Sequence, residues 1–146
     1  MKVALVKTKN PNKVPPILRS ISKPVAHITS EIVALTEDMT KIMHRASGVG
    51  ISAVQVGVPV RVMIVKHGDR DVAYVNPEII STGGPDVPFV EGCLSFPTFY
   101  LEIMRPKKVT IRATMLDGNE IEVTDDDLAA RVFLHEIDHM NGKLFI

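Results

Sequence analysis

His135-Glu136-Ile137-Asp138-His139 lies within LAARVFLHEIDHM, a largely apolar stretch at residues 128–140. In a helix, positions i and i+4 lie one turn apart on the same face, so the two imidazoles can bind one metal ion. Glu136 then lies about 100° round the helix from His135, beside the open side of the ion. The alternative is an amphipathic helix with two ordinary histidines, because a five-residue pattern also occurs by chance.

Start and stop signals support a helix here. Thr124 is placed to cap the helix, and Asp127 lies at the capping-box position. The two aspartates between them suit the positive end of the helix dipole. Asn141-Gly142 supplies a stop. The sequence therefore predicts a helix that begins after Thr124 and ends before Asn141.

A catalytic zinc-type site usually has three protein ligands, and two histidines leave it one short. In HExxH metalloproteases the third ligand lies further along the chain. The residues after His139 read MNGKLFI and include no His, Cys, Asp or Glu, so the third ligand must come from upstream. The candidate is Cys93, the only cysteine, in EGCLS at residues 91–95. A lone cysteine is usually a small buried hydrophobe, but one thiolate with two imidazoles suits zinc or ferrous iron.

A third informative stretch reads GVGISAVQVG at residues 48–57. It is too rich in glycine and apolar residues for an ordinary surface loop. A phosphate-binding loop is a poor match, because there is no third glycine at the dinucleotide spacing and no Gly-Lys-Ser/Thr. The glycines fit better with a backbone that lacks side chains so that another chain can approach it closely.

The three stretches, in this order and at these separations, resemble the peptide deformylases. That family's signature is Gly-x-Gly-Leu-Ala-Ala-x-Gln, then Glu-Gly-Cys-Leu-Ser, then HExDH, and the resemblance covers roughly residues 15–146. Ile51, Ser52 and Val54 replace the family's Leu, Ala and a common Pro, and we expect these changes to tune loop rigidity more than chemistry. Leu134 stands where the family usually has Gln, which brings one helix-side hydrogen bond into question.

The motif, its spacing and the resemblance predict that Cys93, His135 and His139 bind one divalent metal ion, with water at the fourth position. The ion lowers the pKa of that water, and Glu136 can take its proton and later hand it to a leaving amine. The resemblance implies Fe2+, with Zn2+, Ni2+ or Co2+ as substitutes. Ferrous iron beside an oxidisable thiolate predicts sensitivity to oxygen.

The resemblance also implies the substrate, an N-formylmethionyl peptide of a nascent protein, and the products, formate and a free amino terminus. It assigns the Gln55 side-chain amide and the Leu94 backbone N–H to the oxyanion. Gly50 and the extended run Phe89–Glu91 are expected to bind the peptide backbone as an added strand. The positions that match the family's methionine pocket, for each of which simple core packing is the alternative, are Val49, Glu91, Leu128, Arg131 and Val132.

Two other functions fit parts of the pattern. One is an HExxH metallopeptidase, against which the missing downstream ligand argues. The other is a non-catalytic metal-binding module. A closed structural site needs a fourth protein ligand, for which the spare histidines are His27, His44 and His67. A decayed copy would be expected to have lost Glu136 or Gln55, and both are present.

Composition is that of an ordinary globular protein, with 45% hydrophobic and 23% charged residues among 146, and predicts one domain over residues 1–146. Residues 1–30 carry six basic and no acidic residues, and the remainder carries 11 basic and 17 acidic residues. Four prolines in residues 11–24 oppose a transit peptide. One cysteine fits a reducing compartment. We therefore expect a cytoplasmic monomer without DNA or membrane partners.

The chain ends at Ile146, whereas bacterial members of the family usually continue into a segment linked with ribosome docking. It therefore resembles the compact forms that lack this extension, such as those carried by some phages. Transient ribosome contact, if made, would use another surface, and the basic residues 1–30 are the candidate.

The periodicity predicts an α+β fold, with small antiparallel sheets packed around the C-terminal HExxH helix and one further helix near the N-terminus. We expect an irregular segment over 1–29, a helix over 31–46 capped by Ser30, and hairpins at 60–75 and 109–123. Residues 76–77 are expected to end a strand, and 81–85 to form a turn. His67 is expected to be exposed, and Asp138 to be a surface ion-pair partner.

Overall fold

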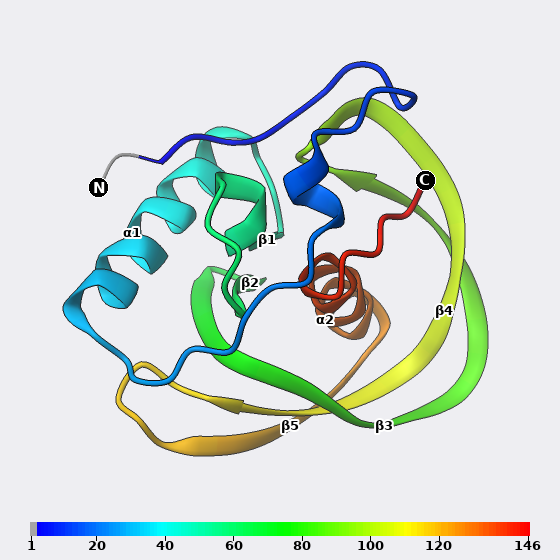
Figure 1. Cartoon of the computed structure of the whole chain (residues 1–146). Helices are drawn as coiled ribbons and strands as arrows, with labels where there is room; N and C mark the ends of the chain where they lie inside the picture. The colour runs from blue at the N-terminus through cyan, green and yellow to red at the C-terminus, as the bar shows by residue number, and fades with distance from the viewer. Residues whose placement is uncertain (1–2) are drawn as a thin grey trace.

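The computed structural model describes residues 3–146 (Figure 1). All five strands form one antiparallel sheet in the order β1-β2-β3-β4-β5. This confirms the α+β class and the C-terminal helix within it, with one sheet in place of several small ones. The elements are η1 (Pro16–Arg19), α1 (Ser30–Arg45), β1 (Gly50–Ser52), η2 (Ala53–Val56), β2 (Val62–His67), β3 (Arg70–Cys93), β4 (Phe96–Thr114), β5 (Glu120–Asp126) and α2 (Asp127–Met140).

The two long strands, β3 and β4, curve around α2 (Figure 1). Their pairing shifts register at four places, between Val75 and Glu78, Ile79 and Ser81, Gly83 and Asp86, and Gly92 and Cys93. Such bulges bend a strand without ending it. The predicted strand end at 76–77 and turn at 81–85 are therefore wrong, because the extra residues are absorbed as bulges and β3 continues to the cysteine.

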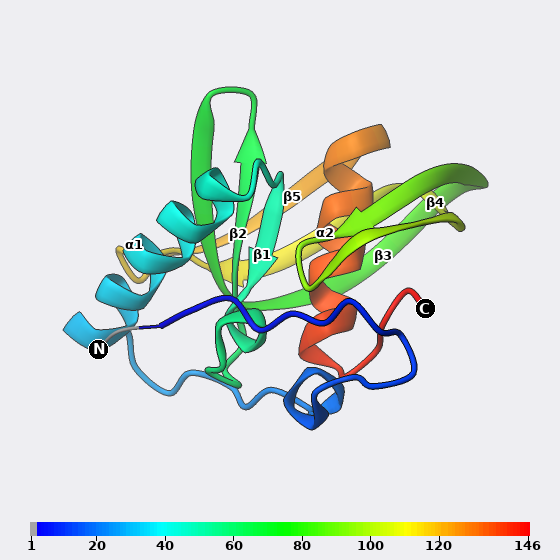
Figure 2. The same ribbon diagram turned by 90° about the horizontal axis from the view of Figure 1, so that it is seen from above.

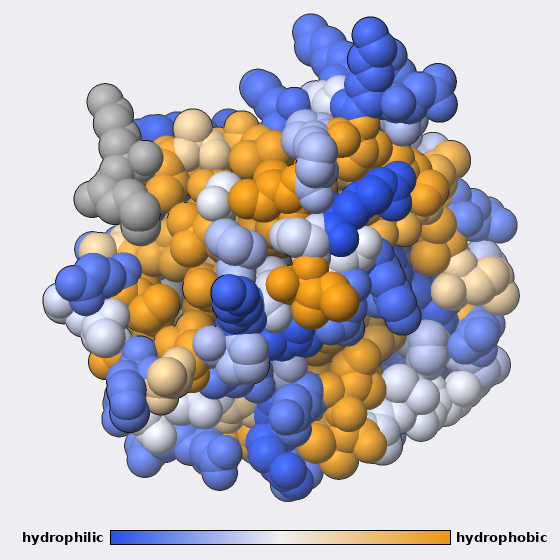
Figure 3. Space-filling model, viewed as in Figure 1, coloured by the Kyte–Doolittle hydropathy of each residue, from blue (hydrophilic) through white to orange (hydrophobic). Residues whose placement is uncertain are grey.

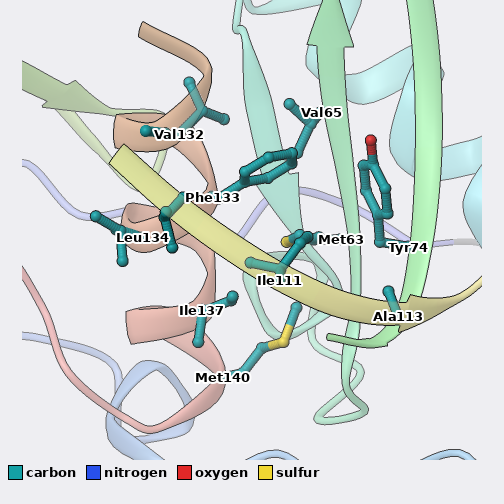
Figure 4. Packing of buried hydrophobic residues seen from close by; sticks show 12 residues of the cluster. Met63, Val65, Tyr74, Ile111, Ala113, Val132, Phe133, Leu134, Ile137 and Met140 are labelled. Carbon is teal, nitrogen blue, oxygen red and sulfur yellow. The ribbon is translucent and has the colours of Figure 1, made fainter. Parts of the chain in front are cut away.

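Strand β2 is buried on both faces between the two helices (Figure 2). Successive side chains of a strand point to opposite faces. Met63 and Val65 belong to the cluster around α2, and Val62 and Ile64 to the cluster around α1. In Figure 4, Phe133 reaches from α2 into the first of these clusters. The cluster around α2 comprises Met63, Val65, Tyr74, Val109, Ile111, Ala113, Ala130, Val132, Phe133, Leu134, Ile137 and Met140.

Both helices begin differently from the predictions. Helix α1 starts at Ser30, and Thr29 rather than Ser30 is its cap, with its hydroxyl accepting from the Ile32 N–H at 3.3 Å. Helix α2 follows β5 directly, and its N-cap Asp126 makes no side-chain cap bond. Thr124 does not cap α2, because its hydroxyl lies 2.8 Å from that of Thr110 across the β4–β5 ladder.

Residues 3–29 run irregularly over the surface, as predicted (Figures 1 and 2). This segment is fastened by backbone bonds from Val6 N–H to the Gln55 carbonyl and from Thr8 N–H to the Ser95 carbonyl. Hydrophilic side chains gather where it turns, at the upper right of Figure 3.

Among the described residues, neither α-helix has the length and apolarity that crossing a bilayer requires.

Candidate metal centre

Three donor atoms from α2 and the end of β3 converge on one point. Cys93 Sγ lies 3.3 Å from His139 Nε2, which lies 3.2 Å from His135 Nε2. All three atoms lie within 4.8 Å of one another. Within residues 3–146 no other group of His, Cys, Asp and Glu side chains has this spacing, and His27, His44 and His67 are not part of it.

The electrostatics of the cluster fit a bound cation. Burial, and then the neighbouring His135, hold the pKa of His139 well below its usual value, so this imidazole is neutral, as a metal ligand must be. Burial opposes a charge on His135, yet hydrogen bonds with Cys93 and Glu91 raise its pKa to about 10. The position between the Cys93 thiol and the Glu91 carboxylate therefore favours a positive charge. A proton on His135 can supply this charge, and a bound divalent ion can supply it instead.

Glu91 fixes the orientation of His135. One carboxylate oxygen of Glu91 lies 2.9 Å from His135 Nδ1, and the other accepts from Arg105 Nε and from Arg131 Nη1, each at 2.6 Å. Burial raises the pKa of Glu91, but the bonds from His135, Arg105 and Arg131 outweigh it and lower the pKa to about 2. The carboxylate therefore stays charged, and its bond to Nδ1 leaves Nε2 directed at the other ligands.

Asp138 extends this network toward the solvent. Arg105 Nη1 donates to Asp138 Oδ2 at 2.9 Å, and the Asp138 side chain is 36% exposed. The ion pair expected for Asp138 is present, but its partner Arg105 is buried and not at the surface. The pair connects Asp138 through Arg105 and Glu91 to a predicted metal ligand.

Glu136 lies beside the three donor atoms at the wall of a pocket of about 450 Å³. Its side chain is buried, and burial raises its pKa above the usual value of a carboxyl group. His139 is buried, at 1% exposure. The other predicted site residues all line this pocket: Val49, Gly50, Gln55, Phe89, Glu91, Cys93, Leu94, Leu128, Arg131, Val132, His135 and Glu136.

Four residues of the glycine-rich stretch 48–57 also line the pocket: Gly48, Val49, Gly50 and Gln55. Gln55 Nε2 donates to Ser95 Oγ at 3.1 Å and lies 3.6 Å from Cys93 Sγ. Ser52 N–H donates to Gln55 Oε1 at 2.9 Å, which fixes the direction of the amide. A Cβ on Gly50 would lie 2.6 Å from Val132 Cγ1, so only glycine lets β1 approach α2 this closely.

The positions matched to a methionine pocket differ in character. Val49, Phe89 and Leu128 are 45%, 53% and 55% exposed at the pocket rim. Arg131 is buried and bound, since its guanidinium also donates to the carbonyl oxygens of Val87 and Ile103. It lies 5.3 Å from the centre of the Phe89 ring. Arg131 is therefore a buried, fixed part of the pocket wall, whereas the other three residues lie at its exposed rim.

The roles of Arg105 and of the Ser52 side chain were not predicted from the sequence. Arg105 precedes a proline in a segment without clear periodicity, and its partner Glu91 is 14 residues away on the paired strand. Only the register of β3 with β4 brings them together. Ser52 is recognisable in the sequence as a hydroxyl residue within an apolar run. Its partner Glu136 is not, because it is 84 residues away.

The chain matches the polypeptide deformylase family model over residues 5–146. It is 46% identical over 136 residues to a peptide deformylase of Rhodopseudomonas palustris (strain TIE-1), covering 88% of this chain and 78% of that protein. It superposes on a Synechococcus elongatus peptide deformylase in complex with actinonin with a TM-score of 0.91 and 31% identity, covering 98% and 76% of the two chains. A probable peptide deformylase from Synechococcus phage S-SSM7 gives a TM-score of 0.89 and 34% identity, covering 99% and 97%.

Proposed function

The chain belongs to the peptide deformylase family, and we propose that Cys93, His135 and His139 hold its metal ion while Glu136 carries the proton. The family's reaction is the metal-dependent removal of the formyl group from N-formylmethionyl peptides, which releases formate. The observation that carries the residue assignment is the convergence of three donor atoms beside a buried carboxylate in one pocket.

A divalent ion held by this donor set supplies Lewis acidity, which polarises a carbonyl and lowers the pKa of water. The chain's own residues prepare the site for it. Glu91 keeps His135 turned toward the cluster, and Arg105 and Arg131 keep Glu91 charged. Burial keeps His139 neutral, which is the form that binds a metal ion.

Glu136 is the proton carrier that this geometry supports. Its buried carboxyl group, beside the three donor atoms at the pocket wall, is proposed to take a proton from the attacking water and to return it to the amine that leaves. The Gln55 amide, held by Ser52 and directed toward Cys93, is placed to donate to the oxyanion that develops on the formyl carbon. We assign the second donor to the Leu94 backbone N–H, next to the cysteine on the same wall.

The peptide is proposed to bind as an extra strand. Strand β1 is the first strand of the sheet, so its outer edge has no partner strand among the described residues. Gly50 on β1 and Phe89–Glu91 on β3 both line the pocket. A peptide lying between them can pair with backbone groups, and its methionine side chain would meet Val49, Leu128, Val132 and the buried Arg131.

The test is formate release from formyl-Met-Ala-Ser by anaerobically purified protein of recorded metal content. Glu136→Ala is expected to retain the metal and to lose about 10²–10⁴-fold in kcat, the usual worth of a positioned acid–base group. Cys93→Ala is expected to weaken metal affinity, and His27→Ala, outside the cluster, to change neither property. Folded, metal-loaded wild type that releases no formate would contradict the proposal. Assays with acetylated and unmodified peptides would then test whether the protein is a different hydrolase.

For the metal we propose Fe2+, with Zn2+, Ni2+ or Co2+ as functional substitutes. The donor set of one thiolate and two imidazoles is compatible with ferrous iron and zinc. The iron form is expected to lose activity in air faster than the nickel form, because iron beside the thiolate exposes both to oxidation. Equal survival of both forms would contradict the expected oxygen sensitivity of the iron form, and the metal content of the anaerobically purified protein tests whether iron is native.

The proposed setting is the cytoplasm, where formylated nascent chains are made, with the protein acting as a monomer. Exposed Lys7, Lys9 and Lys13 on the N-terminal segment are the proposed contact for ribosomal RNA. Co-sedimentation with ribosomes at low and high salt tests this contact against a triple Lys→Gln variant. Actinonin is the proposed pocket ligand, because the S. elongatus structure contains it.

A further inference from the structure

The hydroxyl of Ser52 makes direct contact with the proposed proton carrier. Ser52 is 0% exposed, and its Oγ lies 3.0 Å from Glu136 Oε1 and 2.8 Å from the Glu136 backbone carbonyl oxygen. The resemblance to the family gives alanine at this position, and alanine cannot make this bond. The substitution at residue 52 therefore adds a hydrogen bond to the site, where the sequence predicted only an effect on loop rigidity.

The other oxygen of Glu136 faces Gly50 at the pocket wall. A Cβ built on Gly50 would lie 2.9 Å from Glu136 Oε2, so the missing side chain leaves the space that this oxygen uses. Gly50 and Glu136 both line the pocket, whereas Ser52 lies buried behind them. The two carboxylate oxygens thus have different surroundings. Oε1 contacts the buried Ser52 hydroxyl, and Oε2 lies beside the pocket.

Ser52 also connects the carboxylate to the proposed oxyanion donor. Its backbone N–H donates to Gln55 Oε1 at 2.9 Å, and its side chain binds Glu136. One residue of β1 therefore fixes two polar side chains that come from different elements of the fold. Side chains that are held in this way lose less freedom when the reacting groups come together.

We propose that Ser52 is a positioning residue, whose hydroxyl holds Glu136 Oε1 so that Oε2 stays directed into the pocket for proton transfer. This inference rests on the proposed role of Glu136. Ser52 does not touch the substrate in this scheme, and it acts through Glu136. Its loss should therefore slow the chemical step and leave peptide binding unchanged.

The kinetic test compares Ser52→Ala with Ser22→Ala. Ser22 is a matched control, because it is 2% exposed and its hydroxyl has no hydrogen-bond partner among the described residues. Ser52→Ala is expected to lower kcat about tenfold, the rate equivalent of one ordinary hydrogen bond, with KM and metal content unchanged. Ser22→Ala is expected to leave kcat unchanged. An unchanged kcat in Ser52→Ala, or a rise in KM with kcat retained, would overturn the proposal.

A second readout does not need activity. Urea midpoints of the metal-free wild type, Ser52→Ala, Glu136→Ala and the double variant measure whether the two side chains interact. Ser52→Ala is expected to lower the midpoint in the wild-type background and to lower it less when Glu136 is already alanine. Equal shifts in both backgrounds would show a structural role without coupling, and would overturn the proposal. If the wild type releases no formate, the proposed function fails while this coupling still reports on the Ser52–Glu136 bond.

Discussion

The two sides of α2 are held by different kinds of contact. On one side, Phe133 and Ile137 pack into an apolar cluster with residues of β2, β3 and β4. On the other side, His135 is fixed through Glu91 by two buried arginines. Stability on the apolar side depends on how completely the side chains fill the interior, so exchange between side chains of similar size is tolerated. The polar side depends on the identity of each partner, because a buried charge without its counter-charge is costly.

Glu91→Gln tests the polar side most severely. Glutamine keeps the size of the side chain but leaves Arg131 buried without its counter-charge, and leaves Arg105 paired only with the partly exposed Asp138. We expect a loss of about 3–5 kcal/mol in the free energy of unfolding of the metal-free protein. Metal affinity should fall about 10–100-fold, because His135 loses its orienting partner. Urea unfolding and competition with a metal chelator measure the two effects.

The control for Glu91→Gln is Glu102→Gln, at an exposed position of β4. That variant is expected to stay within about 0.5 kcal/mol of the wild type and to keep its metal affinity. If Glu91→Gln behaved like this control, the account of the polar side of α2 would be wrong.

Alkaline pH should act on the apolar side. Burial, and then the charge of Asp125, raise the pKa of Tyr74 to about 12, above the usual tyrosine value of about 10. Its contribution to stability is therefore fully present below pH 10 and is lost as the pH rises toward 12, a loss of about 2–3 kcal/mol. Unfolding curves between pH 9 and 12 measure it. Tyr74→Phe should lack this loss, and Tyr100→Phe, at a residue 68% exposed, should retain it.

Ile137→Val gives the smallest effect. It removes one methylene from the apolar side, where Ile137 is 2% exposed. We expect a loss of about 0.5–1.5 kcal/mol in the free energy of unfolding. Metal affinity should be unchanged, because the ligand His135 is positioned by Glu91 and not by this contact. A tenfold weaker metal affinity would show that the two sides of α2 are not separable.

The sequence predicted the elements whose pattern is local. Helix α2 and the β4–β5 hairpin follow from periodicity within short windows, and three short motifs gave the residues that the structure brings to one pocket. The length of β3 was not predictable in this way. Its prolines and glycines between residues 76 and 88 read as breaks, and only pairing with β4 makes them bulges.

The parts of the site that depend on distant pairing were also missed. Arg105 meets Glu91 through the β3–β4 register, and Ser52 meets Glu136 through the packing of β1 against α2. A hydroxyl or guanidinium has no periodic signature, so its partner appears only once the fold is known. The predicted cap of α2 failed for a related reason, because the β4–β5 ladder already uses the Thr124 hydroxyl.

Strand β2, buried on both faces, has a consequence for how the molecule opens. Its residues 62–65 contribute alternately to the clusters of α1 and of α2, so neither cluster can be exposed without disturbing the other. The two helices are thereby joined into one cooperative unit, although they scarcely share a surface. The amide hydrogens of Met63 and Ile64 should exchange with solvent only through global unfolding, and they set the slowest exchange rates in the chain.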